Sequence, residues 1–194
     1  MTVQSASLEA VALPVGGHLI SELEDIDGLV RLYKPKVFRF VALSISDRDA
    51  AESITHDCFL KAHATRQRFR GECSIATWLL RIAFNLVRDY TKSKRFKFWR
   101  AAAASSVDPA EISQHLPSRI GSPETQLLAR EQVEIVTRVL EKLSAKQRSV
   151  FLLRFVEDMD LADIASATGM TLPTVKTHLY RAIAEIRARF GDRP

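Results

Sequence analysis

Apolar positions recur every three or four residues through most of the chain, which is the spacing of a single buried helix face. No alternating run flanked by hairpin turns interrupts this pattern, and only 7 Gly and 7 Pro occur in 194 residues, which is low for a sandwich or barrel. The pattern therefore predicts an all-α fold. The predicted helices cover 26–45, 48–65, 75–94, 124–142, 144–156, 160–168 and 173–190.

Polar residues mark the starts of several of these helices. Ser74, Ser144 and Asp160 can each accept a hydrogen bond from a free N–H group in the first turn that follows. Pro35 lies inside the first predicted helix and should bend it or mark a junction within it. The apolar stripes of the helices at 26–45 and 75–94 are Leu29, Leu32, Tyr33, Val37, Phe40 and Val41, and Ile75, Trp78, Leu79, Ile82, Leu86 and Tyr90.

The segment 96–123 has no clear helical period and is rich in Ala, Ser and Pro. A stretch of this length without regular structure argues for two domains rather than one. We therefore expect two small helical domains, at 26–95 and 124–194, joined by a flexible linker at 96–123 and preceded by a flexible tail at 1–25.

Charge is unevenly distributed, although the net charge is only +5, from 28 Lys and Arg against 23 Asp and Glu. Residues 1–30 carry five acidic side chains and no Lys or Arg, whereas residues 85–100 carry six basic side chains against Asp89 alone. An internal basic block favours a polyanionic partner. The alternative is that both segments are ordinary solvated surface.

Several classes of protein find no support in the sequence. Cys58 and Cys73 lack CxxC spacing, which predicts a reduced, cytoplasmic protein, and His56, Cys58 and His63 form no closed set of metal ligands. No segment reaches the ~18–20 apolar residues of a membrane span. No phosphate-binding glycine loop, activated nucleophile or pair of catalytic acids is visible. We therefore expect no metal, no cofactor, no membrane insertion, no small-molecule substrate and no enzymatic activity.

The segment 161–180 predicts a helix-turn-helix. Ala165 is small enough for two helices to cross, Gly169 permits a positive φ in the turn, and Val175 can anchor the second helix. Pro173 suits the start of that helix, where its missing N–H costs no hydrogen bond. Hydroxyl, imidazole and cationic groups near a helix start can contact base edges and phosphates in a major groove. These groups belong to Thr174, Lys176, Thr177, His178, Arg181 and Arg187.

The first predicted domain carries motifs that narrow the class of DNA-binding protein. They are DRDAAE at 47–52, HDCFLKA at 56–62, RFRGE at 68–72 and TWLLRIAFN at 77–85. Together these resemble the second conserved region of bacterial sigma factors.

The second predicted domain adds LSAKQR at 143–148 and TVKTHLYRA at 174–182, which resemble the fourth region of the same proteins. The order and separation of the two motif sets resemble those of the extracytoplasmic-function group of sigma factors. This resemblance implies a protein that binds core RNA polymerase and directs it to promoters. The first domain would recognise and help to open the −10 element, the second would read the −35 element, and the linker would thread through the polymerase.

The resemblance also implies roles for particular residues. The helix at 48–65 would dock on a coiled coil of the largest polymerase subunit through Asp49, Glu52, His56 and Asp57, where relatives usually have Gln and Glu in place of the last two. Unpaired −10 bases are held by stacking and cationic contacts. The −10 contacts would be Phe69, Arg70, Arg81, Asn85, Arg88 and Lys92. The −35 contacts would be Thr171, Pro173, Thr174, Lys176, Thr177, His178 and Arg181.

The −35 reader departs from its relatives at two places, which marks it as the site of this chain's own specificity. Thr171-Leu172-Pro173 stands where many relatives have Pro-Val-Gly, and His178 replaces a common Arg. The opposed DNA-facing surfaces also suggest an anti-sigma factor that clamps or separates the domains.

Two other functions are alternatives to this interpretation. A helix-turn-helix regulator acting without core polymerase would leave the motifs at 47–95 without a role. A sigma mimic that binds an anti-sigma factor and never touches DNA would carry an added receiver domain, for which the chain has no room.

Overall fold

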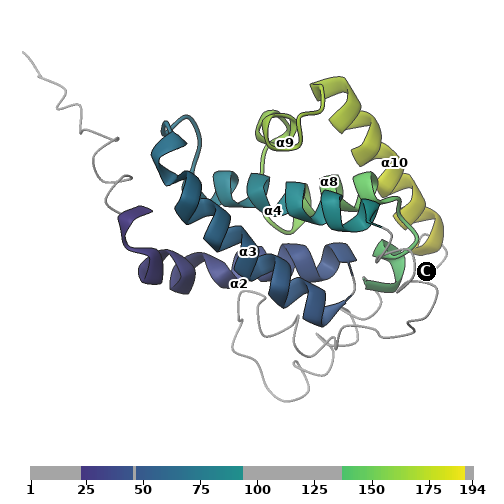
Figure 1. The fold of residues 1–194 in the computed structure, drawn as a ribbon. Helices are drawn as coiled ribbons and strands as arrows, with labels where there is room; N and C mark the ends of the chain where they lie inside the picture. The colour runs from purple at the N-terminus through teal and green to yellow at the C-terminus, as the bar shows by residue number, and fades with distance from the viewer. Residues whose placement is uncertain (1–22, 46, 94–136, 191–194) are drawn as a thin grey trace, which may run out of the picture.

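A computed structural model of the chain describes residues 23–45, 47–93 and 137–190. Within these ranges every regular element is a helix, which confirms the all-α prediction (Figure 1). The elements are α2 (Ile26–Ile45), α3 (Arg48–Thr65), the short 3-10 turn η1 (Arg66–Arg68), α4 (Ile75–Lys92), α8 (Ala145–Phe155), α9 (Leu161–Thr168) and α10 (Leu172–Phe190).

Side chains cap the starts of α3, α4, α8 and α9. The predicted caps are confirmed, because Ser74 Oγ accepts from the N–H of Thr77 at 3.0 Å and Asp160 Oδ1 accepts from the N–H of Asp163 at 2.7 Å. Ser144 forms a full capping box at the start of α8. Asp47 Oδ1 accepts from the N–H of Ala50 at 3.0 Å and so caps α3. Each cap satisfies an N–H group that the helix itself leaves unpaired.

Helix α2 continues through Pro35 as one element of 20 residues, so Pro35 does not divide it into two helices. Proline removes one backbone donor and crowds the preceding turn. Every residue from Val37 to Ile45 is buried, and this packing holds the helix together in spite of the cost of the proline.

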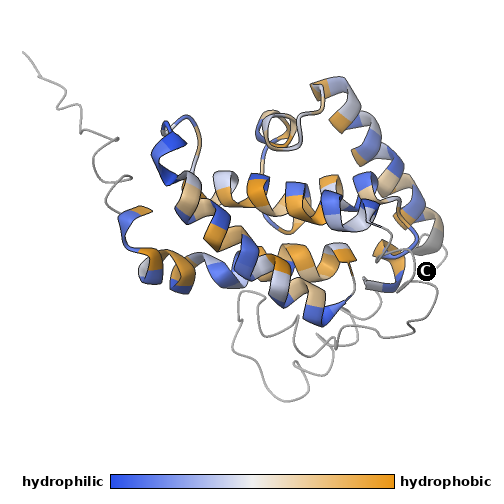
Figure 2. Ribbon diagram, in the orientation of Figure 1, coloured by the Kyte–Doolittle hydropathy of each residue, from blue (hydrophilic) through white to orange (hydrophobic). Residues whose placement is uncertain are grey.

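Both halves of the chain contribute to one continuous core. Helices α2, α3 and α4 pack on one another, as do α8, α9 and α10. The two predicted domains, as far as they are described, also meet, because α8 packs on α2 and α9 packs on α4. Figure 2 shows apolar residues concentrated along the C-terminal part of α2 and along α4, where these contacts are made.

The apolar stripes predicted from spacing are correct in part. Leu32 was expected in the core but is 63% exposed, because it lies at the margin of the stripe that Leu29, Val37 and Phe40 define. Helix α4 buries more than its predicted stripe, since α9 and α8 cover a side that α2 and α3 leave open. The additional buried residues of α4 are Thr77, Leu80, Ala83, Phe84 and Val87.

Some predictions fall outside the described residues. These are the linker at 96–123, the tail at 1–22, and the helix predicted at 124–142 up to residue 136. The described end of that last segment is helical over residues 137–140.

Candidate nucleic-acid interface

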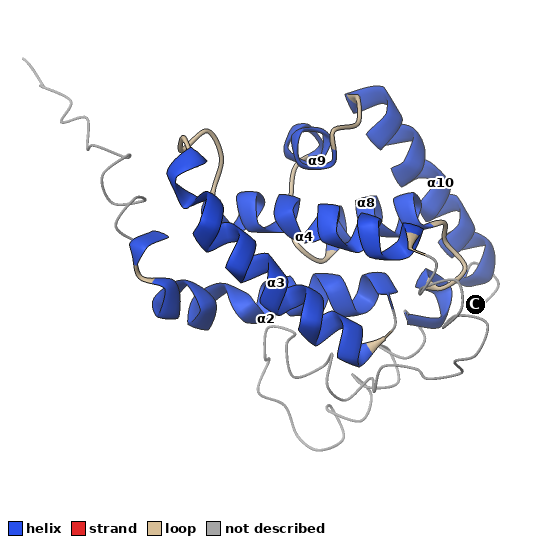
Figure 3. Cartoon of the chain, in the orientation of Figure 1, coloured by secondary structure: helices blue, strands red, loops and turns tan. Residues whose placement is uncertain are grey.

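The predicted helix-turn-helix is formed by α9, a short turn and α10, which Figure 3 shows as two helices joined by a loop. Gly169 has φ +70° in the turn, and its N–H donates to the carbonyl of Ala165 at 3.0 Å. An L side chain in this left-handed conformation would be strained, so the turn requires glycine. Val175 is fully buried and anchors α10, as predicted.

The outward side of α10 and the residue before it form a polar surface that we call the α10 face. Its hydroxyls bond locally, with Thr171 Oγ1 and Thr174 Oγ1 2.8 Å apart and Thr177 Oγ1 donating to the carbonyl of Pro173 at 2.9 Å. Apart from His178, which is half-buried, every member is exposed. The structure therefore brings all seven predicted −35 residues together. The α10 face consists of Thr171, Pro173, Thr174, Lys176, Thr177, His178 and Arg181.

His178 lies in a cationic setting. Burial, followed by the charges of Lys146 and Arg181, lowers the pKa of its imidazole below the ordinary value of 6.5. Its Nδ1 atom is buried without a hydrogen-bond partner. Lys146 comes from the first turn of α8 and was not among the predicted contacts. The only signal in the sequence was that Lys146 lies shortly before the helix-turn-helix. Helical spacing describes one helix at a time and does not show that the start of α8 lies near α10.

The cationic side of α4 carries Arg81, Asn85, Arg88 and Lys92, which we call the α4 face. Arg81 Nη2 donates to the carbonyl of Ser166 on α9 at 3.0 Å and also to the Ser166 hydroxyl. Asn85 Nδ2 donates to the carbonyl of Arg81 at 3.0 Å. Arg88 and Lys92 are exposed, and Arg88 pairs with the neighbouring Asp89. The predicted −10 residues of α4 therefore divide into a covered end and an open end.

The loop before α4 presents the remaining predicted −10 residues. The rings of Phe69 and Trp78 lie 5.2 Å apart at an angle of 50°, and both residues are half-buried. Arg70 follows Phe69 with its side chain 82% exposed, and its contact with Glu72 is a long one of 3.9 Å. The aromatic pair thus supports the loop and leaves Arg70 in solvent.

The four predicted polymerase contacts are exposed on α3, with Glu52 within 3.3 Å of Arg48. Leu60 lies one turn beyond His56 on the same helix side and is 56% exposed. It was not among the predicted contacts, although its place in the HDCFLKA motif, one turn after His56, was an available signal. We call this surface, made of Asp49, Glu52, His56, Asp57 and Leu60, the α3 face.

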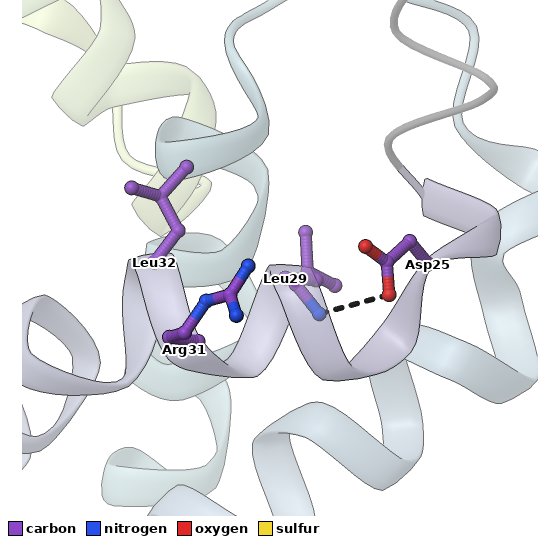
Figure 4. A pocket seen from close by; sticks show the side chains of 5 residues that line it. Asp25, Leu29, Arg31 and Leu32 are labelled. Carbon is purple, nitrogen blue, oxygen red and sulfur yellow. Dashed lines mark hydrogen bonds between the residues drawn. The ribbon is translucent and has the colours of Figure 1, made fainter.

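A shallow pocket lies at the start of α2 and contains none of the predicted site residues (Figure 4). Asp25 accepts a hydrogen bond from the N–H of Gly28 at 2.9 Å there, and a Cβ atom at Gly28 would collide with the Asp25 carboxylate. The polar contact in this pocket is therefore the one that caps the start of α2. Its lining residues are Asp25, Gly28, Leu29, Arg31 and Leu32.

Cys58 and Cys73 are both free thiols, and burial raises the pKa of Cys58 to about 12. Across 23–45, 47–93 and 137–190, no three His, Cys, Asp or Glu side chains are grouped so that they could hold a metal ion. No helix in the described part of the chain is long and apolar enough to cross a membrane.

Two family models match the chain and together span more than half of it. Sigma-70 region 2 matches residues 29–97, and sigma-70 region 4 matches residues 134–186. Among curated proteins, ECF RNA polymerase sigma factor SigW of Bacillus subtilis is 24% identical over 164 residues, covering 84% of this chain and 88% of that protein. ECF RNA polymerase sigma-E factor of Escherichia coli K12 is 29% identical over 158 residues, covering 79% and 80%.

The chain belongs to the extracytoplasmic-function group of sigma factors. Helices α2, α3 and α4 fall in region 2 of this sigma factor, and α8, α9 and most of α10 fall in region 4. The α3 and α4 faces are thus surfaces of region 2, and the α10 face is a surface of region 4.

Solved structures share the fold of this sigma factor. The sigma factor RpoE of Bartonella quintana, in complex with the anti-sigma factor NepR, has a TM-score of 0.60 and 23% identity over 88% of this chain and 99% of that chain. CnrH, in complex with the cytosolic domain of CnrY, has a TM-score of 0.63 and 19% identity over 91% and 97%.

Proposed function

We propose that this sigma factor binds core RNA polymerase through its α3 face and directs it to promoters, where region 2 contacts and opens the −10 element and region 4 reads the −35 element. The observation that carries the proposal is the pairing of two different surfaces on one chain. An acidic α3 face suits a cationic protein partner, whereas the α10 face of a helix-turn-helix suits duplex DNA.

The α3 face has the chemistry of a protein-docking surface. Asp49, Glu52 and Asp57 are exposed carboxylates that can steer the chain toward a basic partner. Leu60 adds an exposed apolar side chain that a partner can bury at the centre of the contact. Charge would mainly set the rate of encounter, and Leu60 would contribute to the lifetime of the complex.

The α10 face has the chemistry of a major-groove reader. Thr174 and Thr177 offer hydroxyls, and Lys176 and Arg181 offer cations, all near the start of a helix held by Val175 and the Gly169 turn. Such groups donate to base edges and phosphates when the helix enters the groove. His178 sits among these cations and would gain a partner for its proton when a phosphate approaches.

The −10 contacts require unpaired DNA, because bases within a duplex do not offer their faces for stacking. Arg70, Arg88 and Lys92 are exposed and can hold the phosphate backbone of a separated strand. Arg81 and Asn85 would join them once Ser166 no longer accepts from Arg81. We infer that this role is one of binding rather than catalysis and that the protein acts in the cytoplasm with the polymerase.

A binding assay with core polymerase tests the proposal. The wild-type chain should co-elute with core polymerase in size-exclusion chromatography and should support run-off transcription from some members of a promoter panel. Glu52→Lys and Leu60→Asp should weaken both, while Glu24→Lys, which changes an exposed acid before α2, should weaken neither. DNA binding without any complex with core polymerase would instead identify a helix-turn-helix regulator.

An anti-sigma factor is the second proposed partner. Two of the solved structures with this fold are complexes, one of the sigma factor RpoE with the anti-sigma factor NepR and one of CnrH with the cytosolic domain of CnrY. A protein that bound between the α4 and α10 faces would block both promoter contacts. Co-expression with the neighbouring gene products should yield a complex that does not bind core polymerase. Constitutive activity in cells, together with no complex with any neighbour, would remove this proposal.

A further inference from the structure

The two halves of this sigma factor are joined by a buried ion pair. Arg39 of α2 donates from Nε to Oε1 of Glu157 at 3.0 Å and from Nη2 to Oε2 at 2.9 Å. Glu157 lies in the turn after α8, and its side chain is completely buried. Lys36 adds a donor to the Glu157 carbonyl at 3.4 Å. A two-pronged contact of this kind fixes orientation as well as distance.

A second set of contacts joins α9 to α4. The guanidinium of Arg81 is bound to the carbonyl and hydroxyl of Ser166, and its Nε atom is buried without a partner. Region 4 thereby covers part of the surface that region 2 is proposed to offer to the −10 strand. The α10 face of the same region 4 remains open.

The ion pair is suited to a contact that forms and opens. Burial is the largest influence on the Glu157 carboxyl and raises its pKa in spite of Arg39 and Lys36, so the charge is held at a cost. Both charges would regain water when the halves separate, which limits the net stability that the pair adds. Removing one partner is different, because the remaining charge would stay buried and unpaired in the closed form.

We propose that the Arg39–Glu157 pair is a latch that holds this sigma factor closed, with α9 occupying Arg81 and so limiting −10 strand binding until region 4 moves away. This inference rests on the proposed function for its biological meaning. The closed and open forms are nevertheless properties of the isolated chain. The latch is built from the chain's own residues and needs no second protein.

The first test measures the distance between the halves in the full-length chain without polymerase. Spin labels are placed at Ser53→Cys on α3 and Ala184→Cys on α10, both exposed positions, in a Cys73→Ser background that retains the buried Cys58. The wild-type latch should give one short distance, and Glu157→Gln should shift the population to longer distances. Asp158→Asn, which alters the adjacent carboxylate whose side chain is 99% exposed, should leave the distance unchanged.

Two further variants keep the test decisive if Glu157→Gln fails to fold. Arg39→Met combined with Glu157→Leu replaces both charges with apolar groups and should restore the short distance. Ser166→Lys places a cation opposite Arg81 from an exposed position and should open the α4–α9 contact without touching the core. Ala188→Lys adds the same charge at an exposed site on α10 and should have no effect on the distance.

Binding of a fluorescent single-stranded oligonucleotide of mixed sequence gives the functional readout. If the closed form makes up about nine-tenths of the free chain, opening raises the apparent affinity about tenfold, and Glu157→Gln and Ser166→Lys should both show this gain. Adding Arg81→Ala to either variant should remove most of it. Folded variants with unchanged distances and unchanged single-strand binding would overturn the latch. That result would leave the proposed function untouched, because polymerase binding and transcription are measured separately.

Discussion

The α10 face and the α4 face are both cationic, but they differ in how much of each is covered by the other half of the chain. On α10, Lys176 and Arg181 are exposed, and nothing from region 2 is bound to them among the described contacts. On α4, Arg81 is engaged by Ser166 of region 4, while Arg88 and Lys92 remain open. The difference shows that the two proposed promoter-contact surfaces are not equally exposed in this structure. On the proposed assignment, we expect full −10 contact to require movement of region 4 and −35 contact to require none.

The largest effect should come from placing a charge in the core beneath the α10 face. Val175→Asp puts an unpaired charge at a fully buried position and should cost about 4 kcal/mol or more, enough to unfold the helix-turn-helix. Circular dichroism should show an early loss of helix, and binding to −35 duplex DNA should disappear. Thr174→Asp adds the same charge at an exposed neighbour and should weaken DNA binding while leaving the melting temperature nearly unchanged.

A smaller effect should follow from removing one proposed DNA contact of the α10 face. Arg181→Ala should weaken binding to −35 duplex DNA about tenfold, which corresponds to one lost contact of ~1–3 kcal/mol. Affinity for core polymerase should stay the same, as measured by fluorescence anisotropy and size-exclusion chromatography. Lys142→Ala removes an exposed cation that lies before α8, outside the α10 face, and is the control. Equal loss of DNA and polymerase binding would mean that Arg181 is structural.

The two ends of the α4 face should respond differently in the free chain. Arg88→Ala should reduce the salt dependence of single-strand binding by about one phosphate contact. Arg81→Ala should leave that dependence nearly unchanged, because Ser166 already occupies the Arg81 guanidinium. A titration with a single-stranded oligonucleotide over a salt series provides the comparison. Equal reductions for both variants would show that the whole α4 face is open.

The smallest effect should be a pH dependence centred on His178. Burial and two cations keep its pKa below 6.5, so the imidazole is neutral at pH 7, and its protonation opposes folding as the pH falls below 6.5. A DNA phosphate would favour the protonated form. Binding to −35 DNA should therefore tighten as the pH falls from 7.5 to 6, beyond the change seen with His178→Gln. Identical pH profiles for the two proteins would show that His178 does not face the DNA.

The helix-turn-helix could be predicted from sequence more fully than the contact between the halves. Caps such as Asp160, the Gly169 turn and the buried Val175 act over a few residues, so their pattern is visible in the chain. Nothing in the local sequence around Arg39 or Glu157 distinguishes either residue from an ordinary solvent-exposed charge. Their burial depends on a partner about 118 residues away, which a local pattern does not specify.

The same reason accounts for the errors in the predicted core. Periodicity reports one buried side of a helix, so it missed the side of α4 that packs on α9 and the exposed position of Leu32. It also missed Lys146, whose charge lowers the pKa of His178 from a different helix. Sequence motifs indicated which regions of the sigma-70 family the chain contains, but tertiary contacts decide which residues of those regions are exposed.

The central claim is that this chain gives core polymerase a two-part promoter specificity, and sequencing of RNA start sites tests it most directly. Genomic DNA of the host would be transcribed by core polymerase with and without the sigma factor. The account predicts start sites that require the sigma factor and share two upstream elements, with Arg181→Ala relaxing the farther one. The same start sites with and without the protein would contradict it.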